Sequence, residues 1–234
     1  MVINSGVYSC DASAIARREK EPEEVSRVGS LTDELQRARD AGDPYVEGLV
    51  ASGESLGEGI DLSYYEFHGV ELDHCSLVRV NLAKASFYDC TLTQCDFSNA
   101  VLSEAFFSRT RLVGCKLEGA QLNGAILRSS RFVDCMCRYL NLGEAKLEGA
   151  VLERCDLREA FLSEVRLRRK TKLQDCDFTR ADFFRASLRG VDISSCTLTG
   201  IGVSTDRSEL RGAVVSVEQA PELAALLGVR FTDL

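Results

Sequence analysis

Cysteine is the residue type with the most obvious chemistry in this chain, which contains ten of them among 234 residues. Seven form a regular series, with a step of 20 residues that lengthens once to 21: Cys75, Cys95, Cys115, Cys135, Cys155, Cys176 and Cys196. Thiols in such a series could bind a metal or form disulfides. However, there is no CxxC pair, the two histidines are not spaced as further ligands, and no secretory signal is visible. We therefore predict free, buried thiols that act as small apolar side chains, with no metal and no cofactor.

Charged side chains offer a second kind of chemistry at residues 166–172, where five of seven residues are basic. This segment also contains the one extra residue that lengthens a step of the cysteine series from 20 to 21. We interpret this segment as a corner that is either a solvated bulge or a contact site for an acidic partner, through Arg168, Arg169 and Lys170. The GxSxG, P-loop and HExxH motifs are all missing from the sequence. We therefore expect a binding protein and not an enzyme.

A five-residue period defines the elements that must position these side chains. From Leu62 to Leu167 every fifth residue is Leu or Phe, with the single exception of Cys137. Five matches neither the helical period of 3.6 nor the strand period of 2. The residue two positions before each Leu or Phe is mostly Ala or Cys, and residues two apart in an extended segment share a side. Four such units return the same environment every 20 residues, which predicts a four-sided coil with a corner after each unit.

Units such as 85–89, 120–124 and 181–185 resemble the A(D/N)LXX unit of the pentapeptide-repeat family. This resemblance implies an all-β solenoid, a right-handed quadrilateral β-helix, and the length allows about seven to eight coils. The expected inward positions include the seven cysteines named above together with Phe67, Phe87, Phe107, Leu122 and Phe178.

The flanking segments lack the five-residue period. We expect an irregular tail at 1–24, a helical cap at 25–58, the repeat solenoid at 59–215, a helix at 216–228 and a tail at 229–234. Within the cap, Ser30 and Gly42 delimit one short helix, and Asp43 with Pro44 begins a second that continues to about residue 52. Ser216 and Gln219 form a capping-box pattern for the C-terminal helix.

The C-terminal helix and the residues around it resemble the close of the quinolone-resistance (Qnr-type) members of that family. In those members the helix caps the rod and joins two rods end to end. The resemblance thus implies a homodimer, formed through Val217, Leu223, Ala224 and Leu227.

The same resemblance implies a partner, DNA gyrase or topoisomerase IV, contacted by mimicry of DNA and giving protection against quinolones or toxins. The charge is unevenly placed: residues 1–59 contain 12 acidic and 6 basic residues, whereas residues 60–215 contain 21 of each. Acidic contacts would therefore come from the N-terminal coils, through Asp61, Glu66, Glu71 and Asp73. The alternative is an interaction scaffold with another protein partner, which the outward apolar Phe106 and Ile126 favour. We expect a cytoplasmic protein that contacts neither nucleic acid nor a membrane directly.

Overall fold

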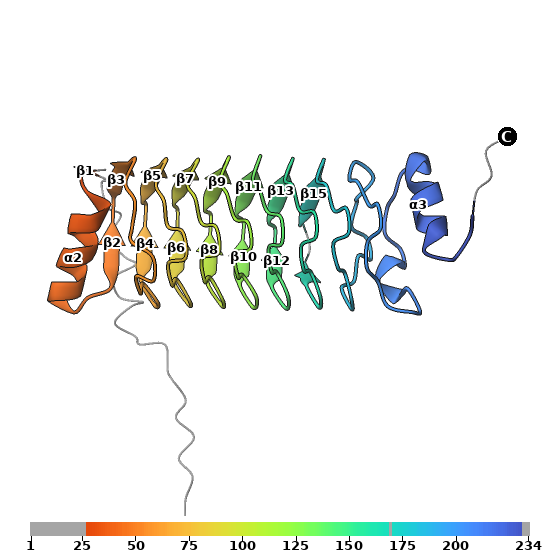
Figure 1. Cartoon of the computed structure of the whole chain (residues 1–234), viewed down its shortest axis with the longest axis horizontal. Helices are drawn as coiled ribbons and strands as arrows, with labels where there is room; N and C mark the ends of the chain where they lie inside the picture. Colours follow the sequence, from red (N-terminus) through yellow and green to blue (C-terminus); the bar gives the residue numbers. More distant parts are fainter. Residues whose placement is uncertain (1–26, 169, 231–234) are drawn as a thin grey trace, which may run out of the picture.

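The computed structural model describes residues 27–168 and 170–230, which form a β-solenoid with a helix at each end (Figure 1). Short parallel strands on successive coils build two sheets. Sheet A has eight strands: β1 (Arg27–Val28), β3 (Leu49–Ser52), β5 (Glu71–Asp73), β7 (Thr91–Thr93), β9 (Arg111–Val113), β11 (Arg131–Val133), β13 (Val151–Glu153) and β15 (Lys172–Gln174). Sheet B has seven: β2 (Tyr45–Glu47), β4 (Glu66–His68), β6 (Ser86–Tyr88), β8 (Phe106–Ser108), β10 (Ile126–Arg128), β12 (Lys146–Glu148) and β14 (Arg166–Leu167).

Two further columns of single β-bridges complete each coil, for example Ser76 with Asp96 and Asn81 with Val101. Two sheets and two bridge columns give the four sides that the sequence predicts. A residue with positive φ recurs at every fifth position from Tyr64 to Glu164, and most of these residues are not glycine. The left-handed backbone therefore turns the chain at each corner, and the stacked coils hold even side chains with a Cβ in this conformation.

The core is the inside of the coil. All seven cysteines of the series are buried free thiols, as predicted. Their sulfurs donate to carbonyl oxygens of their own and the preceding coil: that of Cys95, for example, lies 3.4 Å from the oxygens of Leu72 and of Thr93. Phe67, Phe87, Phe107, Leu122 and Phe178 are each exposed by 2% or less, which confirms the predicted inward positions.

The extra residue near position 170 is absorbed at a corner, as expected. The positive-φ positions step from Glu164 to Lys170, six residues instead of five, and then return to steps of five at Asp175 and Arg180. Pairing in sheet A continues with Leu152 beside Leu173. The core columns therefore keep their alignment past the insertion.

At the N-terminal end, helix α2 (Leu31–Ala41) covers the first coil. Its N-cap Ser30 accepts a hydrogen bond from the Asp33 amide, and Gly42 ends it in the left-handed conformation, as predicted. The Glu54 carboxylate of the first coil accepts hydrogen bonds from the amides of Leu31 and Thr32, at 2.6 and 3.1 Å. A carboxylate at a helix N-terminus is favoured by the helix dipole, so this contact fixes α2 on the coil.

The predicted second N-terminal helix is wrong. Residues 43–52 instead contain β2 and β3, which pair with β4 and β5 at a step of 21 residues. The solenoid therefore begins before residue 59. Val46, Leu49 and Ala51 are its inward residues and are buried. Their spacing fits both an amphipathic helix and two strands joined at Gly48. The strands form because the next coil, with β4 and β5, offers an edge with which they can pair.

At the other end lie three short helices: η2 (Ser208–Leu210), η3 (Val217–Gln219) and α3 (Ala220–Ala225). The capping box of Ser216 with Gln219 is present, and Nε2 of the Gln219 side chain also donates to the carbonyls of Ile193 and Cys196 at 2.8 and 2.6 Å. The C-terminal helix is thus shorter than 216–228 and begins with a 3-10 turn. None of the described helices has the length and apolar character needed to cross a bilayer.

Candidate protein-binding surface

The outward face of sheet B carries two columns of side chains in register. One column runs through Glu66, Ser86, Phe106, Ile126, Lys146 and Arg166. The other runs through Glu47, His68, Tyr88, Ser108, Arg128 and Glu148. Phe106 and Ile126 are direct neighbours in the first column, as predicted from their spacing. Neither column contains a Lys or Arg before residue 128, so the N-terminal part of this face is acidic and aromatic, whereas Lys146 and Arg166 make its C-terminal part more basic.

Four rings on this face form an aromatic strip, which comprises Tyr45, His68, Tyr88 and Phe106. Ring centroids are separated by 4.9 Å between Tyr45 and His68, 4.4 Å between His68 and Tyr88, and 5.4 Å between Tyr88 and Phe106. All four residues are partly exposed. Aromatic side chains supply large contact areas at protein interfaces, so the strip can act as a binding surface.

Carboxylates and a cation border the aromatic strip. The Glu66 carboxylate lies 3.3 Å from Nε2 of His68, and its side chain remains half exposed. At the other end of the strip, the Arg128 guanidinium lies 5.5 Å from the Phe106 ring centroid and 3.3 Å from the Glu148 carboxylate. This pairing holds Arg128 over the last ring and closes the strip toward the C-terminal half.

The four predicted acidic contact residues do not form one surface. Glu66 lies on sheet B, whereas Glu71 and Asp73 lie on β5 of sheet A. Asp61 lies in a bridge column on another side of the coil and accepts hydrogen bonds from the Ser63 amide and the Asn81 side chain, at 3.0 and 2.9 Å. These hydrogen bonds hold the pKa of the Asp61 carboxyl below its usual value.

Three residues of the aromatic strip, Tyr45, His68 and Tyr88, are missing from the predicted contact set. His68 and Tyr88 are 20 residues apart, so the outward column was visible in the sequence. Tyr45 falls in the segment for which the sequence predicts a helix, so its place in this outward column follows only from the structure.

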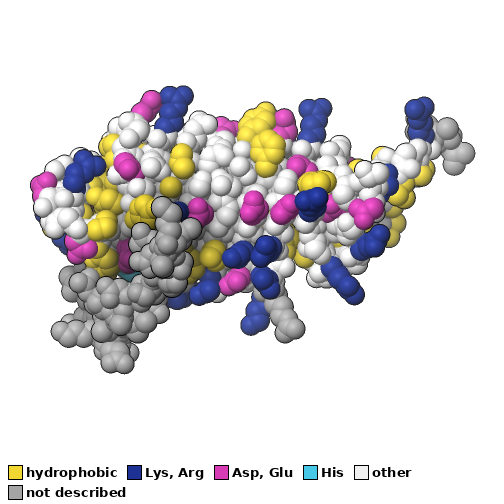
Figure 2. All heavy atoms as spheres, turned by 90° about the horizontal axis from the view of Figure 1, so that it is seen from below, with side chains coloured by type: hydrophobic (Ala, Val, Ile, Leu, Met, Phe, Trp, Pro, Cys, Tyr) yellow, Lys and Arg dark blue, Asp and Glu magenta, His cyan; other side chains and the backbone are white. Residues whose placement is uncertain are grey.

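Ion pairs neutralise much of the surface. Arg109 pairs with Asp89 at 2.5 Å, Arg154 with Asp134 at 2.7 Å and Arg79 with Glu58 at 3.1 Å, and each pair joins successive coils. Figure 2 shows acidic and basic side chains interspersed along the described part of one face of the rod. The described part of this face therefore lacks the continuous acidic surface that a DNA surrogate would present over its whole length.

The basic corner is partly described. Arg168 and Lys170 are exposed, and Lys170 occupies the corner with a φ of 68°. Arg169 lies outside the described residues. Arg168 lines a groove of about 470 Å³ together with Glu164, Val165, Arg166, Leu167, Arg185, Ser187 and Arg189.

At the C-terminal end, the predicted dimer residues differ in exposure. Val217 and Leu227 are 84% and 64% exposed, whereas Leu223 is half-buried and packs against the core of its own rod, and Ala224 is intermediate. Val214, Val215 and Val229 are also exposed, by 38 to 49%. We call Val214, Val215, Val217, Leu227 and Val229 the terminal apolar patch.

Metal coordination has no support in the described part of the chain, where no three His, Cys, Asp or Glu side chains are placed to share an ion. The cysteines face carbonyl oxygens instead, and burial raises the pKa of the Cys90 thiol to about 12. A thiol with such a pKa is protonated at neutral pH, whereas a metal ligand or a nucleophile must be a thiolate.

Comparison with known proteins places the repeats in a described group. A sequence model described as pentapeptide repeats matches residues 66–103, 90–128, 135–169 and 169–200, which together make up more than half of the chain. No curated protein matches. A structure of QnrB1, a plasmid-mediated fluoroquinolone resistance protein, is 21% identical and covers 79% of this chain and 99% of its own, with a TM-score of 0.42. HetL, a pentapeptide repeat protein involved in heterocyst differentiation regulation in the cyanobacterium Nostoc sp., is 22% identical and covers 78% of this chain and 96% of its own, with a TM-score of 0.28.

Proposed function

The chain belongs to the pentapeptide-repeat family, and we propose that it is a non-enzymatic binding protein whose partner is another protein. The N-terminal part of sheet B is the contact surface. The observation that carries this proposal is the aromatic strip, in which partly exposed rings contact one another in sequence from Tyr45 to Phe106. A packed rod with exposed rings and carboxylates favours an extended protein contact over a small-molecule site, because small-molecule sites are concave.

The partner to test first is a type II topoisomerase, DNA gyrase or topoisomerase IV. The resemblance to topoisomerase-protecting members of the family suggests it, and the acidic residues Glu47 and Glu66 on β2 and β4 of sheet B are consistent with it. Their carboxylates would take the place of DNA phosphates against a basic surface. On this proposal the mimicry is confined to the N-terminal coils, because ion pairs and basic residues occupy the rest of the rod.

The test is a supercoiling assay with purified gyrase, with and without ciprofloxacin, at two salt concentrations. We expect the protein to alter supercoiling or to relieve the drug's effect at micromolar concentration, and the effect to weaken with salt because exposed charges are screened within ~8 Å at physiological ionic strength. Replacing Glu47 and Glu66 by Gln should reduce the effect. The control replaces Glu118 and Glu144 by Gln, which removes the same charge from exposed positions elsewhere on the rod.

The second candidate is a scaffold that binds a different protein through apolar contact, which the neighbouring Phe106 and Ile126 favour. Activity toward gyrase that survives the Glu47 and Glu66 changes but is lost in Phe106→Ala would move the contact to these apolar residues. A complete lack of effect on gyrase and topoisomerase IV at micromolar protein would exclude the topoisomerase proposal and leave the scaffold.

A further inference from the structure

The ladder of sheet B ends at β14, although the coil continues. In the preceding coils the amide of the outward residue donates to the coil before it, as Lys146 does to Ala125 and Arg166 to Ala145, each at 2.8 Å. The next residue in this series is Ser187, which follows Arg166 at the 21-residue step. Among the described residues, no main-chain hydrogen bond joins Ser187 or Arg189 to Val165 or Leu167. The two coils are still joined just before this side, where the Glu164 amide donates to the Phe184 carbonyl at 2.8 Å.

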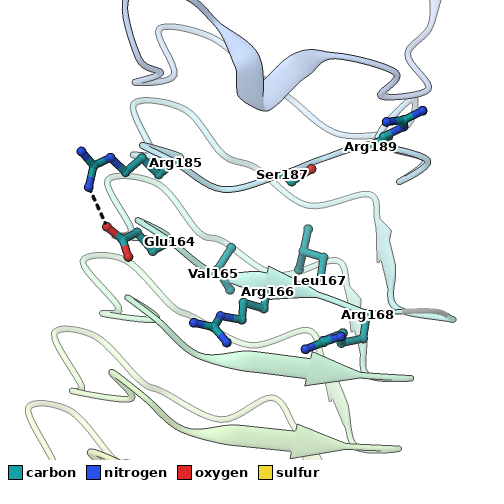
Figure 3. Close-up of a pocket in the computed structure, with 8 residues that line it drawn as sticks. All are labelled: Glu164, Val165, Arg166, Leu167, Arg168, Arg185, Ser187 and Arg189. Carbon is teal, nitrogen blue, oxygen red and sulfur yellow. Dashed lines mark hydrogen bonds and ion pairs between the residues drawn. The ribbon is translucent and has the colours of Figure 1, made fainter.

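The following coil keeps its hydrogen bonds toward the C-terminal end of the rod. The Leu188 amide donates to the Glu209 carbonyl at 2.9 Å, and the Arg185 amide donates to the Glu209 carboxylate at 2.8 Å. Residues 185–189 are therefore held from the C-terminal side, as the equivalent amides of the preceding coils are, but they lack main-chain bonds to β14 on the other side. The groove of about 470 Å³ occupies this break, with β14 on one side and Arg185, Ser187 and Arg189 on the other (Figure 3).

Leu167 shows that the groove uncovers part of the sheet. Its partners in the same inward column, Leu127 and Leu147, are 1% and 0% exposed, whereas Leu167 is only half-buried. The Arg166 and Arg168 amides donate to the preceding coil, to the carbonyls of Ala145 and Leu147. In a parallel ladder the groups left to bond a following strand are therefore the Leu167 N–H and the carbonyls of Val165 and Leu167. The edge of β14 thus offers both a partly exposed apolar side chain, Leu167, and main-chain groups that can form hydrogen bonds.

The charge around this edge is strongly positive. The lining contains four arginines, all exposed, and one carboxylate, Glu164, which pairs with Arg185 at 3.2 Å. Arg166, Arg168 and Arg189 make no ion pair with any residue in the described ranges. Arg166 and Arg168 project from the same side of the chain, because residues two apart in a strand share a face (Figure 3).

We propose that this groove binds an extended acidic segment of a partner protein, which adds to the free edge of β14 as a further strand. The partner's main chain would bond the edge groups of Val165 and Leu167, two acidic side chains would meet Arg166 and Arg168, and an apolar side chain between them would cover Leu167. The recognised pattern is therefore acidic–apolar–acidic. The site is independent of the proposed topoisomerase contact, because it lies in the other half of the rod and selects the opposite charge.

The first experiment measures fluorescence anisotropy with a labelled peptide, Gly-Ser-Glu-Val-Glu-Val-Ser-Gly, and the full-length protein. The control peptide, Gly-Ser-Val-Glu-Glu-Val-Ser-Gly, has the same composition but cannot place both carboxylates on one face of a strand. We expect the first peptide to bind more tightly by about tenfold, the effect of one lost charge-assisted hydrogen bond. Equal affinity for both peptides, or no binding at millimolar peptide, would overturn the proposal.

Variants test the residues. Arg166→Gln and Arg168→Gln should each raise the Kd of the patterned peptide by about tenfold. Arg180→Gln is the matched control, since Arg180 is equally exposed but does not line the groove, and it should leave the Kd unchanged. If all three variants weaken binding to the same degree, the attraction is non-specific and the site is wrong. Melting temperatures equal to that of the wild type show that each variant is folded.

Hydrogen exchange tests the strand addition. Bound peptide should slow exchange of the Leu167 amide by at least about tenfold, because the amide gains an acceptor. N-methylation of alternate residues removes the main-chain N–H donors along one edge of the peptide strand. Methylation of the edge that pairs with β14 should abolish binding. Full displacement of the peptide by millimolar inorganic phosphate, with no protection of Leu167, would show a simple anion site and contradict the proposal.

Discussion

The rings of Phe87 and Phe107 lie 4.9 Å apart between centroids, with their planes inclined by only 8°. Phe67 continues the stack on the other side of Phe87, at 5.0 Å and 10°. These residues are direct partners in the ladder of sheet B, so the spacing of the rings follows the spacing of the strands. A side chain in this column therefore supports both neighbouring coils.

Truncation inside the coil should be costly. Leu122→Ala, at a position that is 0% exposed in the middle of the rod, should lower the free energy of unfolding by about 2–5 kcal/mol, because it leaves a cavity between coils that cannot collapse. Phe87→Ala should cost about 3–5 kcal/mol on the same grounds. Urea denaturation of the wild type and both variants measures this, with the exposed Glu118→Ala as control. An unchanged midpoint for Leu122→Ala would contradict its burial.

The repeat made most of this core predictable. A five-residue period fixes which residues point inward, and the cysteine spacing fixes the number of sides, so Phe87, Leu122 and the thiols could be placed without coordinates. The first coil could not be predicted in this way. Its strands β2 and β3 are too short to show a repeated alternation of apolar and polar residues, and α2 covers them from outside. The groove beside β14 was also invisible in the sequence. It depends on main-chain hydrogen bonds that do not form between β14 and residues 187–189, and the buried Ala186 and Leu188 continue the inward sequence pattern through this coil without a break.

The thiols should be chemically silent in the folded state. The nine described cysteines are buried, and burial raises the pKa of the Cys90 thiol to about 12. Reaction with a thiol reagent requires access to the sulfur, which burial denies to all nine. In a Cys10→Ser variant, which removes the cysteine outside the described residues, we expect no reaction with Ellman's reagent at pH 8 until denaturant unfolds the chain, and then nine reactive thiols. Rapid labelling of the native variant would show that the coil opens.

Glu209 should make stability depend on pH. Burial alone raises the pKa of its carboxyl, but hydrogen bonds from its own amide, from Ser204 and from Arg185 outweigh burial and hold the pKa below the ordinary value of 4.5. The charged form is therefore favoured by folding. Its stabilising contribution is present above pH 4.5 and is lost as the pH falls through the lower, folded-state pKa.

Glu209→Gln should remove this dependence. Thermal melts of wild type and variant between pH 3 and pH 7 should show the wild type more stable at pH 7, with the difference shrinking as the pH falls below about 4.5, where protonation begins in the unfolded chain. Glu144→Gln, at an exposed corner, is the matched control and should give a small difference that does not vary with pH. A constant difference for Glu209→Gln would assign the effect to packing and not to charge.

The terminal apolar patch predicts a dimer that forms end to end. Val217 and Leu227 are 84% and 64% exposed, and Val214, Val215 and Val229 are further exposed apolar side chains of the same C-terminal segment. Apolar surface of this kind is stabilised when a second copy covers it, and a symmetric contact presents the same patch from both copies. The double change Val217→Glu with Leu227→Glu should therefore give monomers in sedimentation velocity, since dimerisation would bury four unpaired carboxylates.

Leu223 is unsuitable for this test, because it packs against its own rod and its replacement would weaken the cap itself. Val28→Glu is the control: Val28 is 90% exposed and lies at the opposite end, so this variant should sediment as the wild type does. A wild type that is already monomeric at tens of micromolar would show that the helix caps the solenoid without joining two rods.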